Sequence, residues 1–131
     1  MSAAREAALP EGLRAALERL LGAGVAEVRI IEHSWFARLH AGARATTRRG
    51  RIYLRDDAAS FFADPGLMLH EYWHVLGQWQ SGELTVTRYL LECLRHGYRR
   101  NRFEVEARAF AAAQVAALRA LLGPAARATV R

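Results

Sequence analysis

The most informative spacing in the chain is His70-Glu71-Tyr72-Trp73-His74, with two histidines four residues apart and a glutamate directly after the first. In an α-helix, residues four apart lie about 40° apart around the axis and about 6 Å apart along it. Both imidazoles can therefore reach one small ion from the same side of a helix. Glu71 lies one step round the helix, where its carboxylate can contact a water bound to that ion. The spacing predicts a metal-activated water that attacks a carbonyl, with Glu71 as general base.

The residues around this motif predict that its helix is largely buried. Asp64-Pro65 is typical of a helix start, because aspartate caps the first turn and proline suits the first helical position. We expect the helix to run from residue 65 to about residue 80. Two unpaired histidines and a carboxylate would be costly in such apolar surroundings, which favours metal ligation over simple packing. The apolar residues that flank the motif are Leu67, Met68, Leu69, Val75 and Leu76.

A catalytic zinc site needs a third protein ligand and keeps a fourth position for water. A separate, roughly antiparallel helix is favoured as its source, because its side chains approach from across the site. Glu104 begins such a helix, but it also has the capping-box spacing from Asn101, and the two roles compete for one carboxylate. Glu106 points about 200° away from Glu104, so only one of them can face the metal. The residues that we consider as the third ligand are His33, His40, Glu83, Glu92, His96, Glu104 and Glu106.

The remaining elements are predicted from hydrophobic spacing and turn residues, and together they indicate an α+β domain. Leucines at helical spacing predict an N-terminal helix over 10–21. A small three-stranded sheet is predicted from the stretches 25–32, 45–47 and 51–55. The last two stretches flank an Arg49-Gly50 turn. We expect the motif helix to lie under this sheet, with a substrate cleft between them.

Two C-terminal helices are predicted after the motif. One spans 85–96 and ends at Gly97, and the other runs from residue 102 to residue 122, where Gly123-Pro124 stops it. Residues 33–43 are ambiguous and could include a short helix. In the third strand, Ile52 and Leu54 should face one way and Tyr53 the other, because side chains alternate along a strand.

Length and composition indicate one globular domain over residues 1–131. Hydrophobic residues make up 52% of the 131 residues, and no apolar run approaches the length of a membrane span. One cysteine, Cys93, excludes an internal disulfide. The formal charge is +6, but the arginines are scattered, so we expect no nucleic-acid partner. The absence of a recognisable signal segment predicts a cytoplasmic protein, and the sequence leaves its oligomeric state open.

The order of these motifs resembles a known family. The chain is similar to the gluzincin zinc metallopeptidases, above all to their small forms, the minigluzincins. It is also similar to the metallopeptidase-like core domain encoded with bacterial contractile injection systems. The resemblance covers residues 25–111. The stretches that carry it are 28–30, 42–46, 50–54, the histidine motif at 70–74, and Asn-Arg-Phe-Glu-Val-Glu-Ala-Arg at 101–108.

These families pair the histidine motif with Glu-x-Glu-Ala, in which the first glutamate is the third ligand. That position is Glu104 in this chain. The resemblance therefore implies a small zincin-like domain that holds Zn²⁺ through His70, His74 and Glu104, with Glu71 as its general base. It also implies an edge strand above the site, here 51–54, to which an extended peptide could add through its main chain.

Two residues depart from the family pattern. Arg102 stands where proline is common, and Arg108 stands where many relatives carry an aspartate that supports a ligand histidine. Groups behind the ligands fix their orientation and tune the metal. An arginine near the site would repel the cation unless it points away or pairs with Glu104 or Glu106.

The function that these observations predict is zinc-dependent hydrolysis of a peptide bond in a peptide or protein substrate. Tyr98 or His96 could donate a hydrogen bond to the oxyanion that forms on attack. The alternative is a catalytically weak or inactive metal-binding module that serves binding or assembly. The short chain and Arg108 favour that alternative. The injection-system resemblance also raises a third role, an effector exported by a specialised system.

Overall fold

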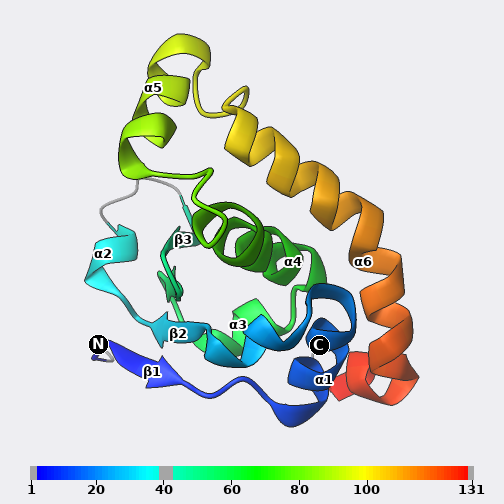
Figure 1. Cartoon of the computed structure of the whole chain (residues 1–131). Coiled ribbons are helices and arrows are strands. Elements are labelled where there is room, and N and C mark those ends of the chain that lie inside the picture. Colours follow the sequence, from blue (N-terminus) through cyan, green and yellow to red (C-terminus); the bar gives the residue numbers. More distant parts are fainter. Residues whose placement is uncertain (1–2, 39–42, 130–131) are drawn as a thin grey trace.

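The computed structural model describes residues 3–38 and 43–129, and it has the predicted mixed α+β architecture. A sheet lies on one side of helix α4, and the long helix α6 lies on the other (Figure 1). The strands are β1 (Arg5–Ala7), β2 (Arg29–Glu32), β3 (Ala45–Arg48) and β4 (Arg51–Leu54). The α-helices are α1 (Glu11–Leu21), α2 (Trp35–Arg38), α3 (Ala58–Phe62), α4 (Pro65–Trp73), α5 (Val86–His96) and α6 (Arg102–Thr129).

The sheet has four strands in the order β1-β2-β4-β3, not the three that were predicted. The missed strand, β1, has only three residues and no apolar alternation, but it pairs antiparallel with β2. The predicted strand over 25–32 is also shorter, because Ala23–Glu27 forms a 3₁₀ turn that places Val25 in the core.

The prediction that residues 51–54 form the edge strand was wrong. β4 lies between β2, its parallel neighbour, and β3, its antiparallel neighbour, so β3 is the strand at the outer edge. The reason is topological: the chain crosses from β2 to the outer position first and returns through the Arg49-Gly50 turn to the inner one. The predicted facing of the inner strand was correct, since Ile52 and Leu54 are buried and Tyr53 is only partly so.

Helix α4 begins where the sequence predicted. The Asp64 carboxylate accepts a hydrogen bond from the Leu67 amide at 3.0 Å, and Pro65 occupies the first helical position. The helix continues as a π-helical turn, η2 (His74–Trp79), so that the whole segment ends near residue 80 as expected. Gly77 is needed in this turn, because a Cβ there would lie 2.7 Å from the Trp73 ring.

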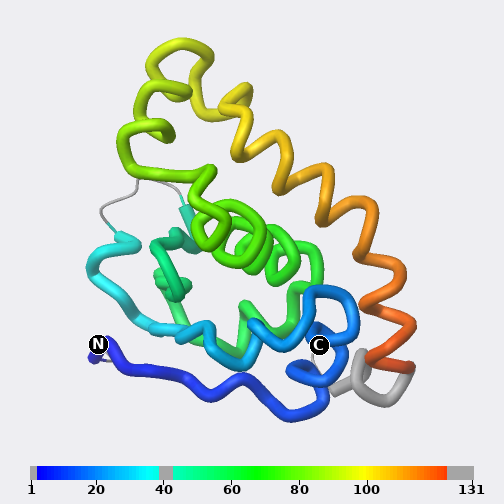
Figure 2. The backbone as a smooth tube through the Cα atoms, viewed as in Figure 1, coloured from blue at the N-terminus to red at the C-terminus, as the bar shows by residue number. Residues whose placement is uncertain are grey.

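The main core fills the space between the sheet, α1, α3, α4 and the second half of α6. Figure 2 follows α6 from its start beside α5 to the neighbourhood of α1. Non-helical Gly123 interrupts α6, in agreement with the predicted stop, and a further turn of helix follows it. The largest fully buried apolar side chains of the sheet, α4 and η2 are Ile30, Ile52, Met68, Leu69, Tyr72 and Val75. The core therefore fixes α4, the helix that carries the histidine motif.

Candidate metal centre

Three side chains predicted as ligands converge between α4, η2 and the first turn of α6. His70 Nε2 lies 2.9 Å from Glu104 Oε1, His74 Nε2 lies 3.3 Å from the same oxygen, and the two imidazole nitrogens are 3.2 Å apart. His74 and Glu104 are buried, and His70 is partly exposed. Together they form a group that could hold a metal ion.

The spacing of these donor atoms fits a small tetrahedral ion. Bonds of about 2.0–2.1 Å in a tetrahedral shell place neighbouring ligand atoms about 3.3 Å apart. The three observed separations, 2.9, 3.2 and 3.3 Å, are close to that value. The backbone therefore already holds the three donors near a binding geometry, with two imidazoles and one carboxylate.

Gln78 fixes the orientation of His74. Its side-chain oxygen lies 2.6 Å from His74 Nδ1, so an Nδ1–H donates to it and the Nε2 lone pair faces the centre. The Gln78 amide nitrogen in turn donates to the Phe103 carbonyl and to Glu106. Gln78 is only 1% exposed, so this chain of contacts is shielded from water.

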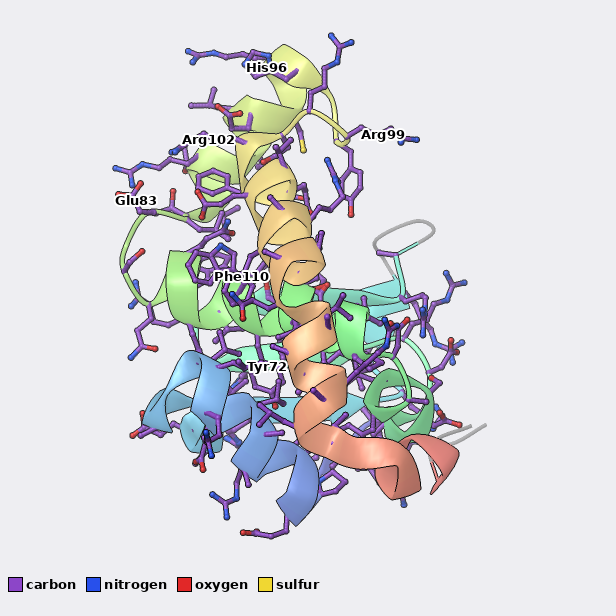
Figure 3. The ribbon with its side chains drawn as sticks, turned by 90° about the vertical axis from the view of Figure 1, so that its right-hand side faces the viewer. Tyr72, Glu83, His96, Arg99, Arg102 and Phe110 are labelled. Carbon is purple, nitrogen blue, oxygen red and sulfur yellow. The ribbon has the colours of Figure 1, made fainter. Side chains whose placement is uncertain are left out.

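Glu106 lies behind the donors and does not join them, in agreement with the prediction that only one of Glu104 and Glu106 faces the centre. Glu106 Oε1 accepts hydrogen bonds from the Trp73 indole at 2.9 Å and from the Gln78 amide at 3.1 Å. The Trp73 ring also stacks on Phe110 of α6, with 4.4 Å between ring centroids. Figure 3 shows Phe110 at the part of α6 that crosses in front of α4. These contacts tie the two ligand-bearing elements together.

Tyr89 of α5 holds the other oxygen of Glu104. Its hydroxyl donates to Glu104 Oε2 at 2.7 Å, which leaves Oε1 for the histidines. Burial alone would raise the pKa of the Glu104 carboxyl, but hydrogen bonds with His70, His74 and Tyr89 lower it well below its usual range. The carboxylate is therefore ionised, as a metal ligand must be.

Glu104 does not cap α6 in the structure, because two other side chains take that role. Asn101 caps α6, because its side-chain oxygen accepts from the Phe103 amide at 2.9 Å. The Glu92 carboxylate of α5 accepts from the Arg102 amide at 3.1 Å, so a second side chain caps the same helix start. Glu104 is released from that role and points to the histidines.

Glu71 lies beside the three donors without joining them. Its carboxylate is buried, and burial raises its pKa above the ordinary value against the opposing charges of His74 and His70. Burial would lower the pKa of His74, but its hydrogen bond with Glu104 and the charge of Glu71 raise it. A buried carboxyl with a raised pKa is suited to exchange protons.

The centre opens into a cleft of about 430 Å³ beneath strand β3. Glu71, His74 and Glu104 line its floor, and β3 forms one wall. The opposite wall is mostly apolar and comes from η2, α5 and the loop between them, through Trp79, Leu84, Val86, Tyr89 and Leu90. A second hollow, lined by His70, Glu71, Tyr98 and Arg108 among others, reaches the centre from the other side.

Tyr98 lines both hollows, whereas His96 lines neither. Partial burial and the charges of Glu104 and Glu71 raise the pKa of Tyr98 to about 12, so its hydroxyl keeps a proton at neutral pH. Figure 3 shows His96 at the outer end of α5. Of the two predicted oxyanion donors, only Tyr98 is therefore placed at the centre.

The other candidate ligands lie elsewhere. The described donor group contains none of His33, Glu83, Glu92, His96 or Glu106, and His40 lies outside the described residues. The two arginines that depart from the family pattern face outward. Arg102 lies near Glu83 and Glu92 and covers the Phe103 ring, while the Arg108 guanidinium donates to the Arg99 carbonyl. Arg108 makes no ion pair with Glu104 or Glu106 in the described structure, although it lines the second hollow beside His70.

Gln78 and Tyr89 were missed as functional residues. Gln78 follows His74 by four residues, the helical spacing at which side chains meet, so the sequence held a signal for it. Tyr89 held none, because its approach to Glu104 depends on how α5 folds back on α6.

Comparison with known families assigns the chain to one of them. Residues 8–82, more than half of the sequence, match the family model of the eCIS core domain. The chain belongs to this eCIS core domain family. Membership associates it with contractile injection systems, and the match includes the histidine motif but ends before Glu104. No curated protein and no solved structure matches the chain. Among the helices of residues 3–38 and 43–129, none has the length and apolar character to cross a membrane.

Proposed function

We propose that this eCIS core domain is a zinc-dependent peptidase. The observation that carries the proposal is the set of three donor atoms 2.9–3.3 Å apart, with a separate buried carboxylate beside them. Two imidazoles and a carboxylate are a ligand set that suits zinc. His70, His74 and Glu104 would hold the ion, and Glu71 would remain free for proton transfer.

The chain's own side chains account for the remaining chemistry. A bound zinc ion supplies an acidified water and polarises the scissile carbonyl. Glu71 accepts the proton of the attacking water and passes it to the nitrogen of the leaving amine. Tyr98, which keeps its proton, donates a hydrogen bond to the oxygen on which negative charge develops. Gln78 and Tyr89 keep His74 and Glu104 in place during these steps.

The substrate we propose is an extended peptide lying along β3. This strand is the edge of the sheet and one wall of the cleft, so its outward main-chain groups can pair with a peptide backbone. The apolar wall opposite accepts side chains of that peptide.

A second candidate function is a binding or assembly module that retains the metal without hydrolysis. The observation in its favour is an apolar row along α5, where Val86, Leu90 and Leu94 are 47%, 62% and 83% exposed and the first two lie at the cleft. Exposed apolar side chains on one helix face are typical of a protein-binding surface. Membership of the eCIS core domain family agrees with protein partners in an injection system.

Two variants separate these functions. Glu71→Gln should keep about one equivalent of zinc but lose hydrolysis, since it removes only the proton acceptor. His74→Ala should lose the metal, because two donors cannot hold a zinc ion tightly. Elemental analysis after dialysis measures the metal, and mass spectrometry of a peptide mixture, with and without chelator, measures cleavage.

A zinc-loaded wild-type protein that cleaves no peptide would leave the assembly module as the function. Full metal retention in His74→Ala would contradict both candidates, because each needs this centre.

A further inference from the structure

We propose that Arg48 recognises a carboxylate of the peptide that occupies the cleft. This inference rests on the proposed peptide hydrolysis and adds the chemical class of its substrate. The residue is the last of β3, and it lines the same cleft as Glu71, His74 and Glu104.

The hairpin geometry shows which groups of β3 face an incoming peptide. Arg48 pairs with Arg51 across the two-residue turn, and the Arg55 amide donates to the Arg44 carbonyl at 2.9 Å. Because hydrogen-bonded and non-hydrogen-bonded pairs alternate in an antiparallel ladder, the amide and carbonyl groups of Ala45 and Thr47 point outward. These four groups are the sites at which a peptide strand could pair.

Arg48 already occupies one of these sites. Its Nη1 donates to the Thr47 carbonyl at 2.8 Å, so the guanidinium lies across the outer edge of its own strand. A peptide strand that pairs with Ala45 therefore meets a guanidinium where the next carbonyl would be. Strand pairing ends there, and at that point the bound peptide should present a chemical group that a guanidinium binds.

Two aromatic rings hold the guanidinium in place. Arg48 Cζ lies 4.7 Å from the centroid of the Phe36 ring and 5.9 Å from that of Trp79. The Trp79 indole is itself fixed by a hydrogen bond to Thr47 Oγ1 at 3.1 Å. A guanidinium held in this way loses little side-chain entropy on binding a ligand, which favours recognition.

The charge of Arg48 is not neutralised within the described structure. Over residues 3–38 and 43–129, no carboxylate lies within ion-pair distance of Arg48, whereas Arg44, near the start of the same hairpin, pairs with Asp64. The two carboxylates in the cleft, Glu71 and Glu104, belong to the candidate metal centre. After its bond to Thr47, the guanidinium retains N–H groups in a planar fork that matches a carboxylate. The ligand chemistry that completes this arrangement is an anionic one.

The carboxylate could be an acidic side chain or the C-terminus of the peptide. The test uses a synthetic peptide library in matched forms, with glutamate or glutamine at each position and with a free or amidated C-terminus. Zinc-loaded Glu71→Gln protein is immobilised at about 0.15 M salt, where non-specific charge effects are screened. Mass spectrometry then gives the ratio of carboxylate to amide forms among the captured peptides. Capture needs no hydrolysis, so it reads the site even if the proposed activity fails.

We expect the Glu71→Gln protein to enrich the carboxylate form about tenfold, the scale of one charge-assisted contact. Adding Arg48→Gln should abolish the enrichment, and Arg48→Lys, which keeps the charge without the fork, should retain part of it. The matched control is Arg49→Gln, which removes the same charge from the exposed neighbouring position and should keep the full ratio.

Three results would overturn the inference: no peptide is captured, both forms are captured equally, or Arg49→Gln lowers the ratio as much as Arg48→Gln. Enrichment that follows glutamate over glutamine identifies an acidic side chain as the source, and enrichment that follows the free over the amidated end identifies the C-terminus. Chelator-sensitive cleavage of the same library by the wild type is scored separately. Its absence would contradict the peptidase proposal and leave the capture ratio valid.

Discussion

Helices α4 and α5 both contribute to the candidate metal centre, but they are supported in opposite ways. In α4, Met68, Leu69 and Tyr72 are fully buried. In α5 no residue is buried, and Leu94 is 83% exposed. Figure 1 shows the consequence, since α4 lies at the middle of the molecule and α5 at its periphery.

The difference separates two tasks. The histidines lie on the helix that the core immobilises, as a metal shell with fixed spacing requires. Helix α5 is held at few points, chiefly by Asn101, whose side-chain nitrogen donates to the Tyr89 carbonyl and to Cys93 Sγ. It supplies one hydrogen bond to Glu104 and a wall of the cleft, neither of which needs a deep core.

The contrast predicts very different costs for the same truncation in the two helices. Leu69→Ala removes a fully buried side chain and should lower the free energy of unfolding by about 2–5 kcal/mol. Leu94→Ala removes an exposed one and should change it by less than about 0.5 kcal/mol. Urea denaturation followed by circular dichroism measures both. A loss above about 1 kcal/mol in Leu94→Ala would show that α5 is covered in solution and would break the contrast.

In η2, which continues the buried helix α4, we expect Gln78 to raise the metal affinity of the centre. Gln78→Leu removes the acceptor from His74 Nδ1, and loss of such a partner typically weakens metal affinity about 10–100-fold. Competition with a chromogenic chelator, well below the unfolding temperature, measures the affinity. Gln80→Leu, at an exposed position two residues on, is the control and should leave it unchanged. Equal affinities in the two variants would contradict the positioning role.

The sequence was sufficient wherever a local pattern decides the structure. The start of α4 follows from Asp64-Pro65, the cap of α6 from Asn101, and the facing of β4 from Ile52 and Leu54. The approach of Glu104 to the histidines was predicted only with the help of the family resemblance. Spacing alone left several acids open.

Non-local contacts decide the features that were missed. Strand β1 has no apolar pattern, and polar pairs hold it, between Arg5 and Glu32 and between Glu6 and Arg29. The order of β3 and β4 depends on the path of the chain after β2, which no residue pattern encodes. A sequence specifies such pairings only through the completed fold.

The pair between Arg5 and Glu32 makes the stability of the sheet that supports α4 sensitive to pH. The hydrogen bond from Arg5, with a second from the Ala58 amide, lowers the pKa of the buried Glu32 carboxyl below its ordinary 4.5. A carboxyl whose pKa is lower in the folded state stabilises that state above its unfolded pKa, and the contribution is lost as the pH falls through the folded value.

Wild type should therefore exceed Glu32→Gln in stability by about 1 kcal/mol at pH 7, a value reduced by the exposure of Arg5. The difference should shrink steadily as the pH falls below 4.5. Urea titrations of both proteins between pH 7 and pH 3 measure it. A difference that stays constant over this range would exclude Glu32 as the source of the pH dependence.

The last predicted effect has the opposite sign and tests how completely α4 is enclosed. The Tyr72 hydroxyl is buried and makes no hydrogen bond to the described residues, and burial raises its pKa far above the ordinary value. A buried donor without a partner costs free energy, so Tyr72→Phe, which keeps the ring and removes the hydroxyl, should stabilise the fold by up to about 1 kcal/mol. Thermal and urea unfolding of the variant measure this gain.

Because Tyr72 lines neither hollow at the metal centre, zinc affinity should stay unchanged. If Tyr72→Phe were less stable than wild type by more than about 1 kcal/mol, the hydroxyl would have a hydrogen-bond partner. Helix α4 would then be less completely buried than its contrast with the exposed α5 implies.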